Sequence, residues 1–307
     1  MRNWRARWRK RAVPSSNAHC PILVTGATSI VGSLLVPMLA ERNLPVICLG
    51  RTPVAISSTV SWRCFDFETA LQDVPVVRGE TLIHTAGIWL LPRWLDSFHG
   101  KGLRRLVAFS STSRFTKQSS VSAEERELAH RLALAENATI ESCQRLGIKW
   151  TILRPTLIYG GLHGDRNVEE IARVIRRFRM FPILGAAKGL RQPVNAKDLA
   201  MACLQVLAVP RTCDKAYNLS GGETLAYSEM VRRIFGVLGY PPMLLPVPIR
   251  VFRAAVWIAR HHPRFRHLTA GMAVRMQEDL VFDHHDASVD FGYQPAPFDP
   301  TYLVRPR

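Results

Sequence analysis

Residues 21–32 read PILVTGATSIVG, a short apolar run followed by a turn of glycine, threonine and serine. A helix-like apolar pattern begins directly after this turn, at Leu34. A strand, a glycine turn and a helix N-terminus in this order bind anions, because backbone N–H groups and the positive end of the helix meet there. The stretch therefore predicts a strand–turn–helix unit that holds the phosphates of a nucleotide. The alternative is the same unit without a ligand.

The turn has the spacing Gly26-x-x-Ser29-x-x-Gly32, in which a serine replaces one of the three glycines usual in dinucleotide-binding turns. A second apolar run, residues 46–50, ends in Arg51. In dinucleotide-binding folds, the residue that binds the adenosine ribose follows the glycine turn by roughly twenty residues. Arg51 is thus the candidate ribose-reading residue.

Further segments of the chain alternate between strand and helix patterns. Residues 62–67, 81–85, 106–109 and 150–153 are expected strands, and apolar positions at helical spacing predict a helix over 123–146 that Gly147 ends. This alternation predicts an α/β fold with a Rossmann-type, doubly wound parallel sheet and a smaller C-terminal capping region. Ligands in such sheets lie at the carboxyl ends of the strands, where the pattern places Gly26, Arg51, Asp66, Thr85, Ala86 and residues 110–113.

The order of these patterns suggests three parts of the chain. We expect residues 1–19 to be a basic tail and residues 20–160 to be the dinucleotide-binding core. Residues 161–307 are then a mixed region that caps the substrate side, with residues 190–220 returning to the core.

The formal net charge is +17, and residues 1–11 hold six Arg or Lys and no acid, interleaved with two tryptophans. Such a tail suits an anionic membrane surface, or is a leader without a function of its own. Residues 249–260 place arginines on one helical face and apolar residues on the rest, which fits a helix on an anionic bilayer or one packed on the core. No apolar run reaches the roughly twenty residues of a spanning helix.

Two further classes of site are not expected. The body of the chain has no nucleic-acid-binding motif, so a specific nucleic-acid partner is not predicted. The six cysteines lack metal-ligand spacing, so neither a metal site nor a disulfide framework is predicted. Unpaired thiols fit a reducing compartment, and we expect a cytoplasmic protein, either free or peripheral at a membrane.

With these residues in view, the chain resembles an extended short-chain dehydrogenase/reductase of the NAD-dependent epimerase/dehydratase type, the group of the nucleotide-sugar epimerases. The matching segments are residues 25–32, 66, 84–87, 109–112, 153–160, 194–198 and 217–222. The resemblance implies a nicotinamide cofactor held by Gly26, Thr28, Ser29, Ile30, Gly32, Arg51, Asp66, Phe67, Thr85, Ala86, Ser110 and Pro155. It also implies a small-molecule substrate such as a nucleotide sugar, with Tyr159 and Arg191 as substrate-binding candidates, and leaves a homodimer open.

The residue at position 51 bears on the choice of cofactor. By the resemblance, NAD-using members carry an acid where this chain has Arg51. A guanidinium can pair with the 2′-phosphate of NADP, whereas a carboxylate repels it. NADP(H) is therefore the expected cofactor in preference to NAD(H).

The catalytic pair of the family is missing. Its members use a tyrosine as general base and a lysine four residues later, but no Tyr-x-x-x-Lys occurs in this chain. Alignment on the Ala135–Glu136 pair puts Leu128 and Leu132 at the two positions. Of the family's catalytic groups only a hydroxyl is retained, with Thr112 as the expected match and Ser111 beside it. The segment between Gly87 and Phe109 is also short, so the usual helix there should be reduced.

Three interpretations of this loss remain open. In the first, other groups carry out acid–base chemistry, with Thr112 joined by Lys117, His84 or Tyr159. In the second, the protein is a reductase in which the cofactor supplies hydride and the solvent supplies the proton. In the third, it is a non-catalytic NADP(H)-binding sensor, scaffold or assembly subunit near a membrane.

Overall fold

The structure is a computed structural model of the 307-residue chain. It describes residues 20–53, 55, 57–67, 80–100, 102–161, 165, 167–248, 250–251 and 274–304. The membrane-surface predictions for residues 1–11 and for nearly all of 249–260 fall outside the described residues. Among those that are described, no helix is both long and apolar enough to cross a bilayer.

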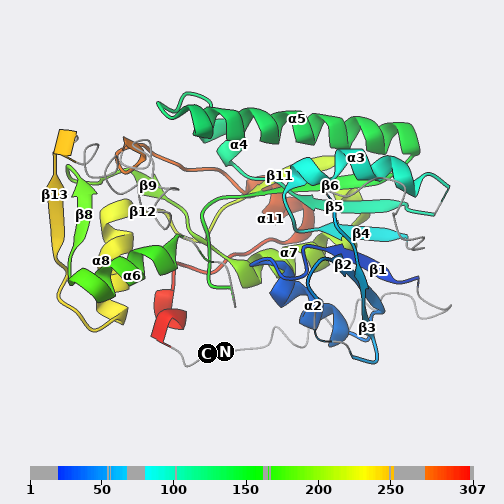
Figure 1. The fold of residues 1–307 in the computed structure, drawn as a ribbon, viewed down its shortest axis with the longest axis horizontal. Coiled ribbons are helices and arrows are strands. Elements are labelled where there is room, and N and C mark those ends of the chain that lie inside the picture. The colour runs from blue at the N-terminus through cyan, green and yellow to red at the C-terminus, as the bar shows by residue number, and fades with distance from the viewer. Residues whose placement is uncertain are drawn as a thin grey trace.

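A seven-stranded parallel sheet forms the centre of the molecule (Figure 1). Its order is β11-β6-β5-β4-β1-β2-β3. The strands are β1 (Ile22–Thr25), β2 (Val46–Gly50), β3 (Val60–Cys64), β4 (Thr81–His84), β5 (Arg105–Phe109), β6 (Lys149–Pro155) and β11 (Lys215–Leu219). The order reverses between β1 and β4, and such a switch point is where open α/β sheets bind ligands. The predicted doubly wound sheet is confirmed, although β3 starts and ends earlier than the expected 62–67.

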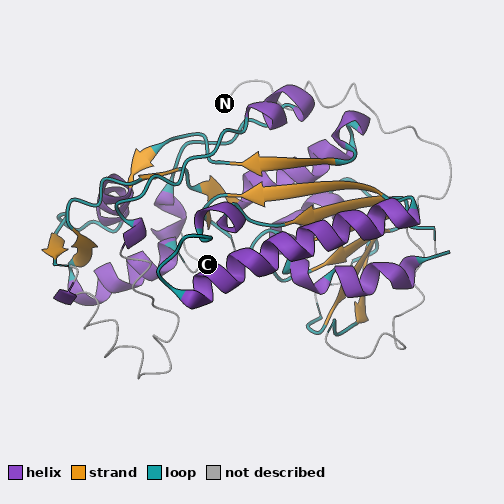
Figure 2. Cartoon of the chain, turned by 90° about the horizontal axis from the view of Figure 1, so that it is seen from above, coloured by secondary structure: helices purple, strands orange, loops and turns teal. Residues whose placement is uncertain are grey.

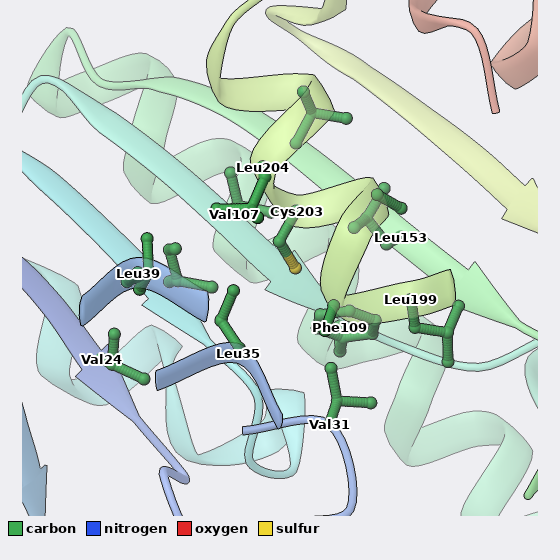
Figure 3. Close-up of a cluster of buried hydrophobic side chains, with 14 of the residues drawn as sticks. Val24, Val31, Leu35, Leu39, Val107, Phe109, Leu153, Leu199, Cys203 and Leu204 are labelled. Atoms are coloured by element: carbon green, nitrogen blue, oxygen red, sulfur yellow. The ribbon is translucent and has the colours of Figure 1, made fainter. Parts of the chain in front are cut away.

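Two helices, α2 (Gly32–Ala40) and α7 (Ala196–Leu207), cover one face of the sheet. Figure 3 shows their apolar side chains meeting those of the strands, with Leu35 from α2 close to Cys203 from α7 and with Leu39 and Leu199 in the same cluster. These four side chains are completely buried. Packing of this kind fixes the start of α2, and therefore the glycine turn before it, against the sheet.

The opposite face is covered by the long helix α5 (Ala123–Leu146) and by the one-turn helix α3 (Pro92–Leu95). Figure 2 shows α5 running the length of the sheet. Acidic residues in its first turn stabilise the helix by interacting with its positive N-terminal end. Gly147, which follows the last helical residue, ends the helix in the left-handed conformation at φ +68°. Only α3 and two short 3₁₀ turns, η2 (Ile88–Leu90) and η3 (Asp96–Phe98), fill the segment expected to be reduced.

A second lobe, at the left of Figure 1, has its own apolar core of Ile171, Ile175, Met230, Ile234 and Phe235. It consists of α6 (Val168–Phe178), α8 (Tyr227–Val237) and the parallel pair β8 (Phe181–Leu184) and β13 (Leu244–Val247). The other elements in the described ranges are α4 (Ser113–Thr116), β7 (Ile158–Tyr159), β9 (Leu190–Arg191), β10 (Val194–Asn195), η4 (Pro210–Thr212), β12 (Leu225–Ala226), α11 (His285–Phe291) and η6 (Pro300–Val304).

Candidate functional site

The turn between β1 and α2 needs glycine at both ends. Gly26 has φ +72°, and a Cβ there would lie 2.6 Å from the backbone nitrogen of Ala86. A Cβ at Gly32 would lie 2.2 Å from the carbonyl oxygen of Gly26. The turn is therefore packed directly against the loop that follows β4, without room for a side chain at either position.

Ser29, the residue that replaces the middle glycine, turns its hydroxyl into the protein. Its Oγ accepts a hydrogen bond from the Gly32 N–H and donates one to Thr85 Oγ1, both at 3.0 Å. The Thr85 hydroxyl in turn lies 2.8 Å from the Gly26 carbonyl oxygen. Within the described part of the chain, the N–H groups of Thr28 and Ile30 have no hydrogen-bond partner. They are free to donate to an anion at the start of α2.

A first cavity of about 280 Å³ opens beside this turn, at the carboxyl ends of β1 and β2. Arg51 lines it, and so does the indole of Trp62. The Trp62 Nε1–H is buried and has no partner among the described residues, so a ligand in the cavity would satisfy it. Glycine backbone, unpaired N–H groups and an arginine in one cavity fit the adenosine and phosphate end of a dinucleotide.

A second cavity of about 310 Å³ lies next to the first, and Ser29 and Ala86 line both. It lies between the ends of β4, β5 and β6 and helix α5. Most of its walls are apolar, contributed by Ile30, Val31, Ile88, Trp89, Phe109, Leu128, Leu132, Pro155 and Ile158. The two cavities are thus neighbours at the switch point of the sheet.

The structure brings most predicted cofactor residues to these cavities. Those lining the first are Gly26, Thr28, Ser29, Arg51, Phe67 and Ala86. Those lining the second are Ser29, Ile30, Thr85, Ala86, Ser110 and Pro155. Gly32 lies behind the turn and acts through its missing side chain. Asp66 lies between two lining residues, Phe65 and Phe67, without lining the first cavity itself.

The two positions of the missing catalytic pair do face the site. Leu128 and Leu132 both line the second cavity. Ser111 lines it as well, whereas the buried Thr112 hydroxyl donates to the carbonyl oxygen of Pro155 at 3.1 Å. The turn into α4 thus places Ser111 beside the cavity and Thr112 against β6. A catalytic role for either hydroxyl stays a prediction.

The three substitute acid–base groups are engaged elsewhere. His84 is completely buried between Thr25 Oγ1, at 2.7 Å, and the Gly87 carbonyl oxygen, at 3.1 Å. Burial lowers its pKa to about 4, although the Gly87 hydrogen bond opposes the shift. The buried Tyr159 hydroxyl bonds to the backbone of Pro297 and Asp299. Lys117 lies 4.0 Å from Glu125. None of the three lines either cavity as described.

Arg191, the predicted substrate arginine, is 4% exposed. Its guanidinium donates to the carbonyl oxygens of Leu190 and Glu278, each at 2.7 Å, and to that of Arg275. It also lies 5.4 Å from the ring centre of Tyr227. These contacts fasten residues 275–279 to the second lobe. A substrate contact by Arg191 or by Tyr159 stays a prediction.

Sequence reasoning missed a buried carboxylate directly behind the second cavity. Glu136, on α5, is completely buried and accepts hydrogen bonds from Ser110, Arg114 and Arg154. The Arg154 Nη2 lies 2.7 Å from a Glu136 oxygen. The cluster joins β5, β6, α4 and α5 at the cavity wall and occupies the Ser110 hydroxyl. A glutamate one turn beyond Leu132, on the buried face of the helix, was the available signal.

Trp89 was also missed. Its indole lies over Gly87, where a Cβ would come within 2.4 Å of the ring. The ring lines the second cavity and is stacked by the guanidinium of Arg131, 4.0 Å from its centre. The close approach of Trp89 to Gly87 depends on the short η2 turn. The sequence pattern does not predict this contact.

Comparisons with known proteins point to the same kind of fold and site. The model of the NAD dependent epimerase/dehydratase family matches residues 90–220. Divinyl chlorophyllide a 8-vinyl-reductase, chloroplastic, of Zea mays is 22% identical over a region covering 81% of this chain and 66% of the reductase. The chain spans only 26% to 66% of the lengths of the first curated relatives it matches.

Two solved structures share nearly the whole fold. The epimerase Mth375 of Methanothermobacter thermautotrophicus has a TM-score of 0.72 at 17% identity, covering 94% of this chain and 90% of that one. MoeE5, in complex with UDP-glucuronic acid and NAD, has a TM-score of 0.69 at 18% identity, covering 92% and 95%. At such identities the likeness establishes the fold. The chain is thus similar to the NAD dependent epimerase/dehydratase family over residues 90–220, and it has the fold of the solved epimerases.

Proposed function

We propose that this protein is an oxidoreductase that binds NADP(H) along the two cavities and works without a tyrosine–lysine pair. The observation that carries the proposal is that the two cavities are adjacent and share Ser29 and Ala86 in their walls. Arg51 lines the outer end and the two leucines line the inner end. A dinucleotide laid across the switch point would place its adenosine half beside Arg51 and its nicotinamide half beside Pro155.

Arg51 supports the choice of the phosphorylated cofactor. It is exposed at the end of β2 and lines the first cavity with Thr52. An arginine at this point can form charge-assisted hydrogen bonds to a 2′-phosphate. The chain offers no carboxylate at position 51 to accept hydrogen bonds from the two hydroxyls of an NAD ribose.

The inner cavity supports reduction more than epimerisation. A bound nicotinamide supplies or accepts a hydride. Removing hydride from a sugar carbon that bears a hydroxyl also requires a base to take the hydroxyl proton, and Leu128 and Leu132 cannot accept one. A carbonyl or conjugated double bond has no proton to lose, because it takes up a hydride at one atom and a proton from water at the other. Ser111 and Ser113 line the cavity, and their hydroxyls are available to orient such an acceptor.

The relatives support two substrate classes. The reductase of Zea mays, by its name, acts on a vinyl group, which fits an apolar inner cavity. MoeE5 holds a nucleotide sugar, and an anionic substrate of that class is the second candidate. Arg191, the arginine expected to bind it, is buried and donates to backbone carbonyl oxygens.

The experiment is calorimetric titration of the full chain with NADP⁺ and NAD⁺, for the native protein and for Arg51→Asp. We expect Arg51→Asp to weaken NADP⁺ binding about tenfold or more, a change of about 1.4 kcal/mol, and to leave NAD⁺ binding nearly unchanged. Arg42→Asp is the matched control, because Arg42 is also exposed but donates to the Met38 carbonyl oxygen beyond the cavity.

Three outcomes separate the alternatives. Equal loss of both cofactors in Arg51→Asp would remove the NADP assignment. Binding without oxidation of NADPH by any carbonyl or conjugated acceptor in a broad panel would favour the non-catalytic interpretation. Absence of binding for both nucleotides would overturn the proposed function and leave only the fold.

A further inference from the structure

Large apolar side chains are exposed at the outer end of the second lobe, where β8 and β13 lie side by side (Figure 1). They are Phe178, Met180, Met243 and Leu245, each between 38% and 60% exposed, and we call these four side chains the outer patch. The Phe181 N–H donates to the Met243 carbonyl oxygen, which brings the two chain segments of the patch together. A cluster of exposed large apolar side chains marks an interaction surface.

The same end of the lobe is strongly basic. Residues 171–190 contain four arginines, one lysine and no acid, and residues 230–251 contain three arginines and no acid. Arg176, Arg177 and Arg179 are exposed in the segment that holds Phe178 and Met180. Among the described residues, none of these three arginines is paired with a carboxylate. The outer patch therefore lies in a positively charged surface.

The carboxylates of the two helices of the lobe lie at their opposite ends. Glu169 and Glu170 are in the first turn of α6, and Glu229 is in the first turn of α8. The C-terminal ends of both helices meet beside the patch, where the Arg179 guanidinium lies 3.6 Å from the ring centre of Tyr240. Each helix has eleven residues and is about 16 Å long. Their acidic turns are thus too far away to neutralise the arginines at the patch.

This combination of side chains favours an anionic bilayer over other partners. A second copy of the chain would bring like charges together, and Pro246 within β13 has no N–H with which to extend the sheet. A nucleic acid would pair with the arginines and leave the apolar side chains exposed. A bilayer offers both contacts, because arginines bind the anionic headgroups and apolar side chains enter the boundary between headgroups and acyl chains.

We propose that the outer patch docks the protein on the surface of an anionic bilayer. The four apolar side chains enter the headgroup layer, and the three neighbouring arginines pair with lipid phosphates and carboxylates. The contact is peripheral, as no helix of the described part of the chain can span a bilayer. The inference is independent of the proposed function, because no residue of the patch lines either cavity.

The test is sedimentation of the full chain with vesicles of phosphatidylcholine alone and with vesicles of phosphatidylcholine and phosphatidylserine in equal parts. We expect the chain to bind the mixed vesicles about tenfold or more tighter. Met243→Glu should weaken binding to the mixed vesicles about tenfold or more, because it puts a carboxylate among apolar contacts and next to anionic headgroups. Arg177→Gln should weaken it roughly fivefold, as expected for one arginine near an anionic surface.

Each variant has a matched control outside the patch. Leu134→Glu is matched to Met243→Glu, because both residues are 55% exposed and Leu134 lies on α5 and lines neither cavity. Arg42→Gln is matched to Arg177→Gln, since Arg42 is exposed just after α2. Both controls should change vesicle binding by less than about twofold. Residues 1–11 are the same in every variant, so these pairs separate the patch from the basic tail.

Several results would overturn the inference. One is no binding of the native chain to the mixed vesicles, and another is equal weakening by Met243→Glu and Leu134→Glu. A dimer of the native chain that Met243→Glu dissociates would assign the patch to a second copy. A lower midpoint of thermal unfolding in Met243→Glu than in Leu134→Glu would show that the protein's own chain covers the patch. NADP⁺ titration is a separate measurement, so the proposed function can fail while this inference holds, and the reverse.

Discussion

Ser29 Oγ lies 3.0 Å from Thr85 Oγ1, so that a side chain of the phosphate turn is hydrogen-bonded to the loop after β4. The same Ser29 oxygen accepts the N–H of Gly32 at the start of α2. Two neighbouring strands and one helix are joined through this single hydroxyl. A glycine, which most dinucleotide turns have here, could not make either contact with a side chain.

We therefore predict that Ser29→Ala lowers the free energy of unfolding by about 1–2 kcal/mol, because the partly buried Gly32 N–H and Thr85 hydroxyl each lose a hydrogen bond. Urea unfolding followed by circular dichroism measures the change. Ser33→Ala is the control, since the Ser33 hydroxyl makes only a long, 3.4 Å bond to the Ile30 carbonyl oxygen. Equal stability of the two variants would show that the Ser29 contacts contribute nothing.

Glu136→Gln should cost about 3 kcal/mol or more, because it leaves two mostly buried guanidiniums without their shared counter-charge. The predicted readout is a lower midpoint of thermal unfolding. Glu141→Gln, at an exposed position of the same helix, should change the midpoint little.

A double-mutant cycle tests the ion pair between Glu136 and Arg154 directly. Arg154→Met should cost less in the Glu136→Gln background than in the native protein, since the ion pair is already broken there. Additive costs in the two backgrounds would contradict a direct interaction between Glu136 and Arg154.

His84 makes the stability depend on pH. Burial holds its folded-state pKa near about 4, below the 6.5 of an unfolded histidine. The unfolded chain therefore binds the extra proton first, and stability falls as the pH drops from 6.5 towards 4, by roughly 3 kcal/mol in all, and levels off below that.

Replacing the imidazole removes this dependence. His84→Asn keeps a polar group near Thr25, and we expect it to show a flatter fall of unfolding free energy between pH 6.5 and 4 than the native protein. The exposed His99 provides the control, because His99→Asn should keep the native slope. A native slope in His84→Asn would assign the pH dependence to other groups.

Local patterns predicted the framework well. The helix over 123–146 was predicted to the residue, because apolar spacing marks its length and Gly147 gives it an end. The phosphate turn and the leucines at 128 and 132 were also found, since each depends on spacing within one segment.

What depends on distant contacts was not predicted. Two of the carbonyl oxygens that Arg191 binds, those of Glu278 and Arg275, are more than eighty positions away along the sequence. The choice between Ser111 and Thr112 turns on the backbone direction at the start of a four-residue helix. The platform formed by Trp89 and Arg131 joins a 3₁₀ turn to a helix, and neither segment alone indicates the other.

The place of β11 at the edge of the sheet bears on how the chain is assembled during synthesis. β11 pairs along its length with β6, yet α6, β8 and α7 lie between these two strands in the sequence. On a ribosome, the edge of β6 that pairs with β11 stays unpaired until α6, β8 and α7 have emerged. Unpaired edges invite association with other chains, so a product that stops before Lys215 would be prone to aggregate.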